Sequence, residues 1–260
     1  MRRKDFILNT GGLILSSFTS ANLLASVHSS NSLNSQINIG VIGTGSRGQG
    51  LIKLLNGIEG FNVVGACDNI PFRLEEGISL IPTTKIAKAY SDYRKLLDDK
   101  KIDAVIVSTP LNTHDEISID ALDAGKHVYC EKTMAKGISS TQKLVKKCKQ
   151  SNKIFQTGHQ FHSSRMYKQL VEIILDGKVG NIVSIEAQWN RNGDWRRIVK
   201  NPLQERQINW RMYREYSYGL LAELSAHQID FANWILGETP KRAVGFGGIN
   251  YWKDGRETYD

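Results

Sequence analysis

The sequence is poor in the residues that mark several classes of protein. It has three cysteines and five prolines among 260 residues, and no two cysteines have the spacing of a CxxC metal or redox site. It has no low-complexity tract and no repeat of solenoid length, which excludes collagen-like and repeat-array proteins. No apolar run is unbroken enough for a stable membrane span. The length fits one large domain or two modest ones.

Basic residues are in moderate excess over acidic residues. There are 34 Lys and Arg against 26 Asp and Glu, which gives a formal net charge of +8. Most basic residues are scattered over predicted helix faces, and no motif that reads nucleic acid accompanies them. We therefore expect no nucleic-acid partner, while acidic ligands stay open. Cys67, Cys130 and Cys148 are interpreted as small core residues.

The first thirty residues are typical of an export signal. Arg2 and Arg3 precede a weakly apolar stretch that runs to about residue 27 and contains several small residues. Basic residues followed by Phe6 and Ile7 resemble a twin-arginine signal. We expect a periplasmic or otherwise exported protein whose folded part begins near residue 36. A disordered tail on a cytoplasmic protein is the alternative.

A glycine-rich turn follows the first predicted strand, over residues 37–42. Gly43, Gly45 and Gly48 give the pattern G-x-G-x-x-G at the start of a helical pattern over 47–55. In such a turn the first glycine permits the bend, and the second lets the backbone approach a pyrophosphate at the helix N-terminus. The third allows helix and strand to pack closely. The sequence therefore predicts a dinucleotide site.

An acidic residue follows the second predicted strand, over 61–67. Asp68 stands twenty residues after Gly48 and can accept hydrogen bonds from the ribose hydroxyls of an adenosine. Its charge would repel a 2′-phosphate, which favours NAD over NADP, although Arg73 can soften that preference. The alternative, that Asp68 caps the helix starting at Pro71, is compatible with this role.

Strands and helices continue to alternate up to residue 157. Further strands are predicted over 103–107, 127–130 and 154–157, with helices over 113–124 and 139–150 between them. Such units indicate an α/β fold with a doubly wound parallel sheet, which binds ligands at the carboxyl ends of its strands. Ser108, Lys132 and His159 fall at such ends.

The pattern changes after Gly158. A helix is predicted over 163–175 and a strand over 181–189, and a long loop over 190–218 is rich in arginine and aromatic residues. Guanidinium groups and aromatic faces suit a polyhydroxylated or carboxylated ligand, but they are also enriched at subunit interfaces. The predicted substrate-binding residues are His159, Trp195, Arg196, Trp210, Arg211, Tyr216 and Asp230.

A helix predicted over 219–236 carries three ionisable side chains on one face. Glu223, His227 and Asp230 stand at i, i+4 and i+7. Glu and His at this spacing can bind zinc, but the sequence offers no obvious third ligand. We therefore favour proton transfer, with His227 as the acid/base and Glu223 as its support. A structural histidine with satisfied hydrogen bonds is the alternative.

Together these motifs resemble the Gfo/Idh/MocA oxidoreductases from about residue 37 onward. The resemblance rests on the glycine turn with Arg47, on Ser108-Thr109-Pro110 with His114, on Glu131-Lys132, and on Glu223, His227 and Asp230. It implies a Rossmann domain and then an α+β domain with an open, mostly antiparallel sheet. That second domain would carry the substrate contacts and often the oligomer interface. Accordingly, we expect an export segment and linker over 1–35, the Rossmann domain over 36–157 and the substrate domain over 158–260.

The resemblance also implies an activity, which is hydride transfer between tightly bound NAD and a hydroxyl-bearing carbon of a sugar, polyol or glycoside. It implies that Lys132 contacts the reacting hydroxyl and that His227 is the acid/base, with Glu223 where the family usually has Asp. The predicted cofactor-binding residues are Gly43, Thr44, Gly45, Ser46, Arg47, Gly48, Asp68, Ser108, Thr109, Pro110, His114 and Glu131. An NAD-dependent glycosidase that works by transient oxidation and a non-catalytic sugar-binding module are the alternatives.

Members of this family usually extend further than this chain. The second domain is predicted to have few strands, over 182–189 and 242–250, so its sheet would have an unpaired edge. We therefore expect a chain that is short at its C-terminus, and a homo-oligomer for the full-length protein.

Overall fold

The computed structural model describes residues 36–83, 86–190 and 193–259. The predicted export signal and linker, over 1–35, lie outside these ranges, as does Arg191 of the arginine-rich loop. Within the ranges given, no helix is both long and apolar enough to cross a membrane.

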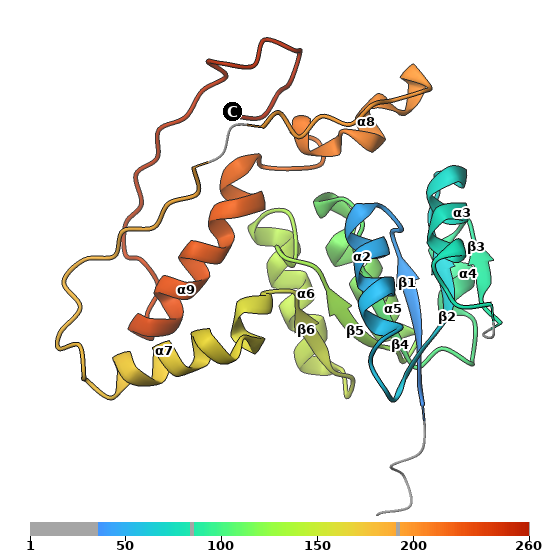
Figure 1. Ribbon diagram of the computed structural model, residues 1–260, viewed down its shortest axis with the longest axis horizontal. Helices are drawn as coiled ribbons and strands as arrows, with labels where there is room; N and C mark the ends of the chain where they lie inside the picture. The colour runs from blue at the N-terminus through green and yellow to red at the C-terminus, as the bar shows by residue number, and fades with distance from the viewer. Residues whose placement is uncertain (1–35, 84–85, 191–192, 260) are drawn as a thin grey trace, which may run out of the picture. The chain divides into compact units, whose positions relative to one another are not determined.

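A six-stranded parallel sheet organises the first half of the described chain (Figure 1). Its strands are β1 (Ile37–Ile42), β2 (Phe61–Cys67), β3 (Lys88–Tyr90), β4 (Ala104–Val107), β5 (His127–Cys130) and β6 (Phe155–Thr157). They lie in the order β3-β2-β1-β4-β5-β6, and every neighbouring pair is parallel. The order reverses between β1 and β4, where sheets of this kind bind ligands. The predicted α/β fold with a doubly wound parallel sheet is confirmed.

Helices follow the first five strands and cover both faces of the sheet. They are α2 (Ser46–Leu55), α3 (Pro71–Ser79), α4 (Tyr93–Leu97), α5 (His114–Asp123) and α6 (Ile138–Gln150). Side chains alternate between the faces, so Val105 and Val107 of β4 pack with α4, α5 and α6, whereas Ile106 packs with α2. Because both faces are covered, the central strands are mostly apolar, and the last four residues of β1 and the last three of β4 are buried.

Regular structure is sparser after Gly158. The segment contains η3 (Gln160–Ser163), α7 (Arg165–Leu175), α8 (Glu205–Ile208), the π-helical turn η6 (Leu221–Ser225) and α9 (Ala226–Leu236). The helices predicted over 163–175 and 219–236 are therefore present, the second with a π-helical first turn. The two helices pack together through Tyr167 and Phe231, whose ring centroids are 5.4 Å apart.

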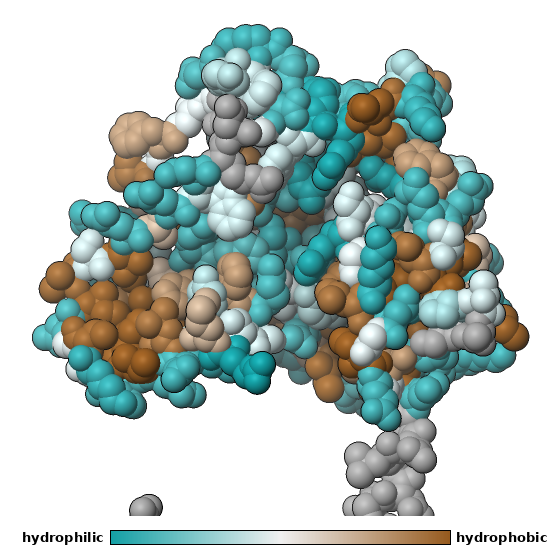
Figure 2. Space-filling view, viewed as in Figure 1, coloured by the Kyte–Doolittle hydropathy of each residue, from teal (hydrophilic) through white to brown (hydrophobic). Residues whose placement is uncertain are grey.

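The antiparallel sheet predicted for 158–260 is not formed in the described part of that region. Residues 181–190 and 241–250 contain no strand, because a strand requires a hydrogen-bonded neighbour and neither segment has one among the described residues. Val183 and Phe246 are accordingly 95% and 98% exposed. Other apolar side chains of this region are also exposed, and Figure 2 shows a group of them over α7 and α9.

Candidate active site

A cleft of about 900 Å³ lies at the carboxyl ends of the central strands. One wall is the glycine turn after β1, and the other is formed by residues 195–216 and by the start of α9. The predicted site residues that line it are Gly43, Gly45, Ser46, Arg47, Asp68, Ser108, Thr109, Pro110, His114, Glu131, Lys132, Trp195, Trp210, Arg211, Tyr216, Glu223 and His227. Those that do not line it are Thr44, Gly48, His159, Arg196 and Asp230.

The glycine turn has the shape that a dinucleotide diphosphate requires. Gly43 has φ +90°, and a Cβ there would lie 2.7 Å from the backbone of Ser108. A Cβ on Gly48 would lie 2.0 Å from the carbonyl oxygen of Gly43, whereas at Gly45 the nearest atom is 3.9 Å away. The N-terminus of α2 has no side-chain cap, so its first N–H groups can bind an anion. These residues fit the diphosphate of NAD.

Asp68 is tied to this turn by hydrogen bonds. Its Oδ2 accepts from the backbone N–H of Thr44 at 2.8 Å and from the Thr44 hydroxyl at 3.3 Å. Its Oδ1 accepts from the N–H of Ile70 at 2.9 Å, just before α3 begins. The carboxylate therefore holds the chain ahead of α3 and at the same time faces the cleft, so both predicted roles are compatible with the geometry. Thr44 lies behind the cleft surface and positions Asp68.

Arg47 and Glu131 join the start of α2 to the end of β5. The Glu131 carboxylate is 2.7 Å from both Nε and Nη2 of Arg47. Burial works against the guanidinium charge, but Glu131 outweighs it, and the pKa of Arg47 is raised. This ion pair fixes the two sides of the topological reversal relative to each other.

His114 is an almost fully buried residue of the cleft lining and connects two of the cleft's loops. Its Nδ1 lies 2.8 Å from the carbonyl oxygen of Thr133, and its Nε2 lies 2.9 Å from that of Thr109. Both partners are acceptors, so the protonated ring, in which both nitrogens donate, satisfies both contacts. Burial opposes this charge, but the Cys130 sulfur and the two carbonyl groups raise the pKa of His114 to about 9. The ring thereby fixes the residue that follows Lys132.

Lys132 extends from the end of β5 toward the π-helical turn. Its Nζ donates a hydrogen bond to the carbonyl oxygen of Glu223. Burial lowers the pKa of Lys132; Glu223 counteracts this, while Arg211 and Arg47 contribute further to the decrease. The ammonium group is thus poorly solvated and releases a proton more readily than a surface lysine does.

His227 lies at the start of α9 and faces the same cleft. Its side chain packs against Phe161, with ring centroids 5.0 Å apart, and against His159 at 5.9 Å. Burial lowers the pKa of His227, and the charges of Lys132 and His159 lower it further. Its buried Nδ1 has no hydrogen-bond partner in the described part of the chain. The lowered pKa means that the fold disfavours the protonated form of this ring.

The three ionisable residues of the predicted helix have separate partners. The Glu223 carboxylate accepts from Arg211 Nε at 3.0 Å and from the Ser217 hydroxyl at 3.1 Å. Asp230 accepts from His162 Nε2 at 2.8 Å, outside the cleft. The structure therefore engages Glu223 with Arg211 and Lys132 rather than with His227, and it does not bring the three residues together as ligands of one ion.

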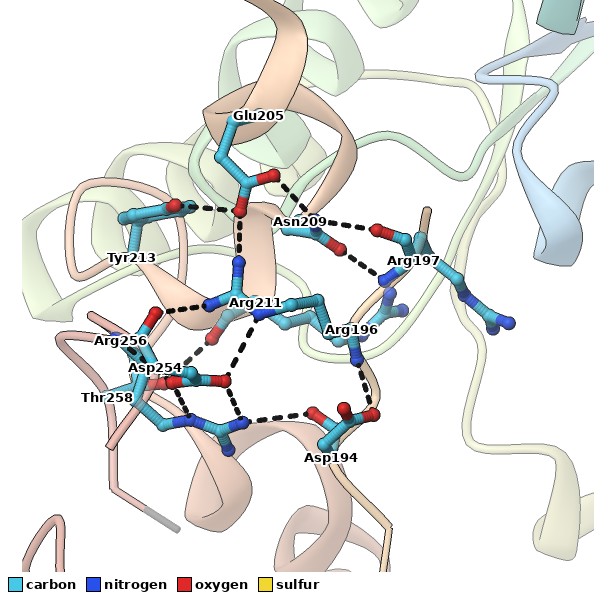
Figure 3. Close-up of polar contacts among 10 residues, drawn as sticks. All are labelled: Asp194, Arg196, Arg197, Glu205, Asn209, Arg211, Tyr213, Asp254, Arg256 and Thr258. Carbon is cyan, nitrogen blue, oxygen red and sulfur yellow. Dashed lines mark hydrogen bonds and ion pairs between the residues drawn. The ribbon is translucent and has the colours of Figure 1, made fainter. Parts of the chain in front are cut away.

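The arginine-rich loop supplies the wall opposite the glycine turn. Arg196 points away from the cleft into a polar network with Glu205 and Asp254 (Figure 3). Arg197, its neighbour, lines the cleft, although sequence reasoning did not select it. The sequence carries no signal that separates these adjacent arginines, because their directions depend on partners far along the chain. Asn209 was also missed, and it holds the backbone of Arg197.

Two models of one protein family match consecutive parts of the chain. The oxidoreductase family with an NAD-binding Rossmann fold matches residues 37–159, and the GFO/IDH/MocA C-terminal domain matches residues 167–260. A myo-inositol 2-dehydrogenase from Thermotoga maritima is 28% identical over 81% of this chain and 58% of its own length. A 2,7-anhydro-N-acetylneuraminate hydratase from Escherichia coli is 29% identical over 82% of this chain and 53% of its own length.

Solved structures show the same fold. The scyllo-inositol dehydrogenase from Lactobacillus casei with bound NAD(H) and scyllo-inositol superposes with a TM-score of 0.62. It is 23% identical, and the match covers 78% of this chain and 57% of that one. The chain thus spans little more than half the length of the relatives it matches.

Proposed function

The chain belongs to the Gfo/Idh/MocA oxidoreductase family, and from this premise we propose that it transfers a hydride between NAD and a hydroxyl-bearing carbon of a sugar or polyol. One observation carries the proposal: the glycine turn, Lys132 and His227 all line one cleft. The names of the similar inositol dehydrogenases agree with a polyhydroxylated substrate.

The residues around the reacting carbon divide the proton chemistry between them. NAD⁺, when bound at the glycine turn, supplies the hydride acceptor. His227, whose pKa is lowered by burial, takes the proton of the substrate hydroxyl in the cleft. Lys132 stabilises the negative charge that develops on that oxygen. The lowered pKa of Lys132 also permits the reverse assignment, in which the lysine accepts the proton and His227 donates a hydrogen bond.

The test compares variants at these two positions with a matched lysine variant. Lys132→Met and His227→Ala should each reduce kcat at least about a hundredfold, because each removes a group that acts on the proton or on the alkoxide charge. NAD affinity should persist, since neither residue belongs to the glycine turn. Lys136→Met is the control, because Lys136 packs over the Tyr218 ring at 4.6 Å and does not line the cleft.

The measurement is NADH formation from a panel of inositols, hexoses and hexuronates, with NAD binding followed separately by fluorescence. If both cleft variants turn over as fast as the Lys136 variant, the assignment fails. If NAD binds and no member of the panel reduces it, the proposed reaction fails.

A reaction without net redox change is a second candidate. The similarity to a hydratase favours it, and the same residues could serve a transient oxidation that allows a bond at a neighbouring carbon to break. The product separates the two reactions: NADH accumulates with turnover in the first and does not in the second.

Export, cofactor retention and assembly are further parts of the proposal. The basic start followed by a weakly apolar stretch in residues 1–27 supports export through a twin-arginine route, which carries folded proteins. NAD would then travel in its site and stay there, and the mature protein would act as a homo-oligomer. Nicotinamide found in the purified full-length protein, by absorbance and mass, would support retention, and free exchange of NAD would contradict it.

A further inference from the structure

Two arginines of the cleft wall neither give nor take a proton in the proposed reaction. We propose that Arg197 and Arg211 bind the carboxylate of an acidic sugar, so that the enzyme selects a sugar acid over the corresponding neutral sugar. This inference rests on the proposed function and names its substrate class. The alternative is that the same arginines bind NAD, and the variants described below distinguish NAD binding from binding of the sugar carboxylate.

Arg211 is held in place with part of its guanidinium group free. Its Nε donates to the Glu223 carboxylate at 3.0 Å, and its guanidinium carbon lies 4.1 Å from the centroid of the Trp210 ring. Glu223 is its one ion-pair partner in the described ranges, so the two Nη groups are not taken up by a second carboxylate. A guanidinium group fixed at one edge presents its remaining N–H groups in the geometry that suits a carboxylate.

Arg197 is fixed through its backbone rather than its side chain. Its N–H donates to Asn209 Oδ1 at 2.6 Å, and Asn209 Nδ2 donates back to its carbonyl oxygen at 3.0 Å. The Asn209 side chain is buried and also donates to Glu205. Figure 3 shows the Arg197 side chain extending away from the network that surrounds Arg196.

The neighbouring arginines differ in how their charges are compensated. Arg196 pairs with both Glu205 and Asp254. Arg197 has no carboxylate within 4.0 Å in the described part of the chain, yet it lines the cleft. A charge that the fold fixes at a cleft wall without a counter-ion is available for a ligand of opposite charge.

The pKa of Arg73 reflects burial together with the positive charge of Arg197 and Arg211 in the cleft. Burial lowers the pKa of Arg73; Asp68 and Glu76 counteract this, whereas Arg211 and Arg197 lower the pKa further. The charges of Arg197 and Arg211 therefore disfavour a further positive charge in the cleft, and an anion bound beside these two groups would relieve that repulsion.

The two walls of the cleft separate a cofactor role from a substrate role. Arg73 comes from α3, and its Nη1 would be 3.9 Å from a Cβ on Gly45, so it faces the diphosphate turn. Arg211 lies on the opposite wall and is joined to Lys132 through Glu223, which accepts from both side chains. A substrate whose hydroxyl reaches Lys132 can therefore bring a carboxylate to Arg211.

The experiment uses the full chain loaded with NAD. The probes are D-glucuronate and D-galacturonate, their methyl esters, and D-glucose and D-galactose. The methyl esters keep the shape of the acids and remove the charge. Wild-type protein should show kcat/KM at least about tenfold higher for an acid than for its ester, since a bidentate carboxylate contact is lost.

Arg197→Gln and Arg211→Gln should each reduce that preference, the ratio of kcat/KM for an acid to that for its ester, at least about fivefold without changing the affinity for NAD. Arg206→Gln is the matched control, because Arg206 is on the same loop, pairs with Glu215 and Glu257, and does not line the cleft. A weaker affinity for NAD in the Arg197 and Arg211 variants would assign these arginines to the cofactor and overturn the inference.

The pattern of binding and turnover separates a carboxylate site from the proposed hydride transfer. Oxidation of neutral sugars with no preference for the acids would retain the function and overturn the inference. Calorimetric binding of the acids, sensitive to Arg211→Gln but without turnover, would retain the acid site and overturn the function. No binding and no turnover of any probe would overturn both.

Discussion

The two halves of the described chain are stabilised in different ways. From β1 to β6, backbone hydrogen bonds of a continuous ladder set the positions of the site residues, and the sheet is covered on both faces. After Gly158, hydrogen bonds of single side chains set many of these positions. Asn209, for example, bonds to the backbone of Arg197 and donates to the Glu205 carboxylate. The wall of the cleft at the glycine turn is therefore a property of the fold, whereas the opposite wall, over residues 195–216, depends on individual residues. Substitutions in the two halves should differ accordingly.

The largest expected effect is at the glycine turn. Gly48→Ala places a Cβ 2.0 Å from the carbonyl oxygen of Gly43, and backbone cannot move aside as a flexible side chain can. We expect the free energy of unfolding to fall by about 4 kcal/mol and NAD binding to be lost. Urea unfolding and NAD titration measure the two quantities.

The control for this prediction is two residues further along the same helix. A Cβ on Gly50 would meet nothing within 4 Å, so Gly50→Ala should stabilise α2 by about 0.5–1 kcal/mol. Equal effects at the two positions would show that helix propensity rather than close packing decides the outcome there.

The second largest expected effect is a pH dependence of the free energy of unfolding, which should have opposite signs in the two halves. His114, in the first half, has its pKa raised to about 9 by its carbonyl partners and Cys130, against the effect of burial. Its stabilisation is complete below the unfolded pKa of about 6.5 and is lost as the pH rises through about 9, which amounts to about 3 kcal/mol. Unfolding measured from pH 6 to pH 10 should show this loss, and His114→Asn should abolish it.

His159 and His227, in the second half, should behave in the opposite way. Burial lowers the pKa of each, so their neutral rings are favoured in the folded state. Their contribution to stability is present above about pH 6.5 and is lost as the pH falls below that value. Hydrogen exchange of α9 and of the sheet, measured at pH 5.5 and pH 9, separates the two trends. Identical trends in both regions would contradict the assignment.

The same contrast explains how much of the fold could be predicted from the sequence. The predicted bounds of β1, β2 and β5 match the structure, because buried strands are continuous apolar runs that end at turn residues. β3 and α4 were missed, since a three-residue strand and a five-residue helix are too short to show a period.

The second half was less predictable for a physical reason. The alternation over 181–189 was interpreted as a strand, but alternation creates no strand unless a neighbour completes the ladder. The motifs did indicate Lys132 and His227, which line the same cleft. They could not indicate that Glu223 pairs with Arg211, or that Arg197 rather than Arg196 faces the cleft, because those directions depend on contacts distant in the sequence.

The smallest expected effect is in an extended segment of the second half. Phe246 is 98% exposed, so Phe246→Ser removes no buried apolar surface. The free energy of unfolding should change by less than about 0.5 kcal/mol. Phe155→Ser in β6 is the matched control: Phe155 packs against the core of the sheet, and its loss should cost about 2–3 kcal/mol. Urea unfolding of the two variants measures both values.

A large decrease in the free energy of unfolding of Phe246→Ser would contradict the difference described between the two halves. Because a fully exposed ring contributes nothing to stability, a cost similar to that of Phe155→Ser would mean that another surface covers residues 241–250 in solution. Unfolding that depends on protein concentration would identify that surface as a second copy of the chain, whereas independence of concentration would place it within the same chain. Either outcome would mean that packing, and not only the contacts of single polar side chains, stabilises the second half of the described chain.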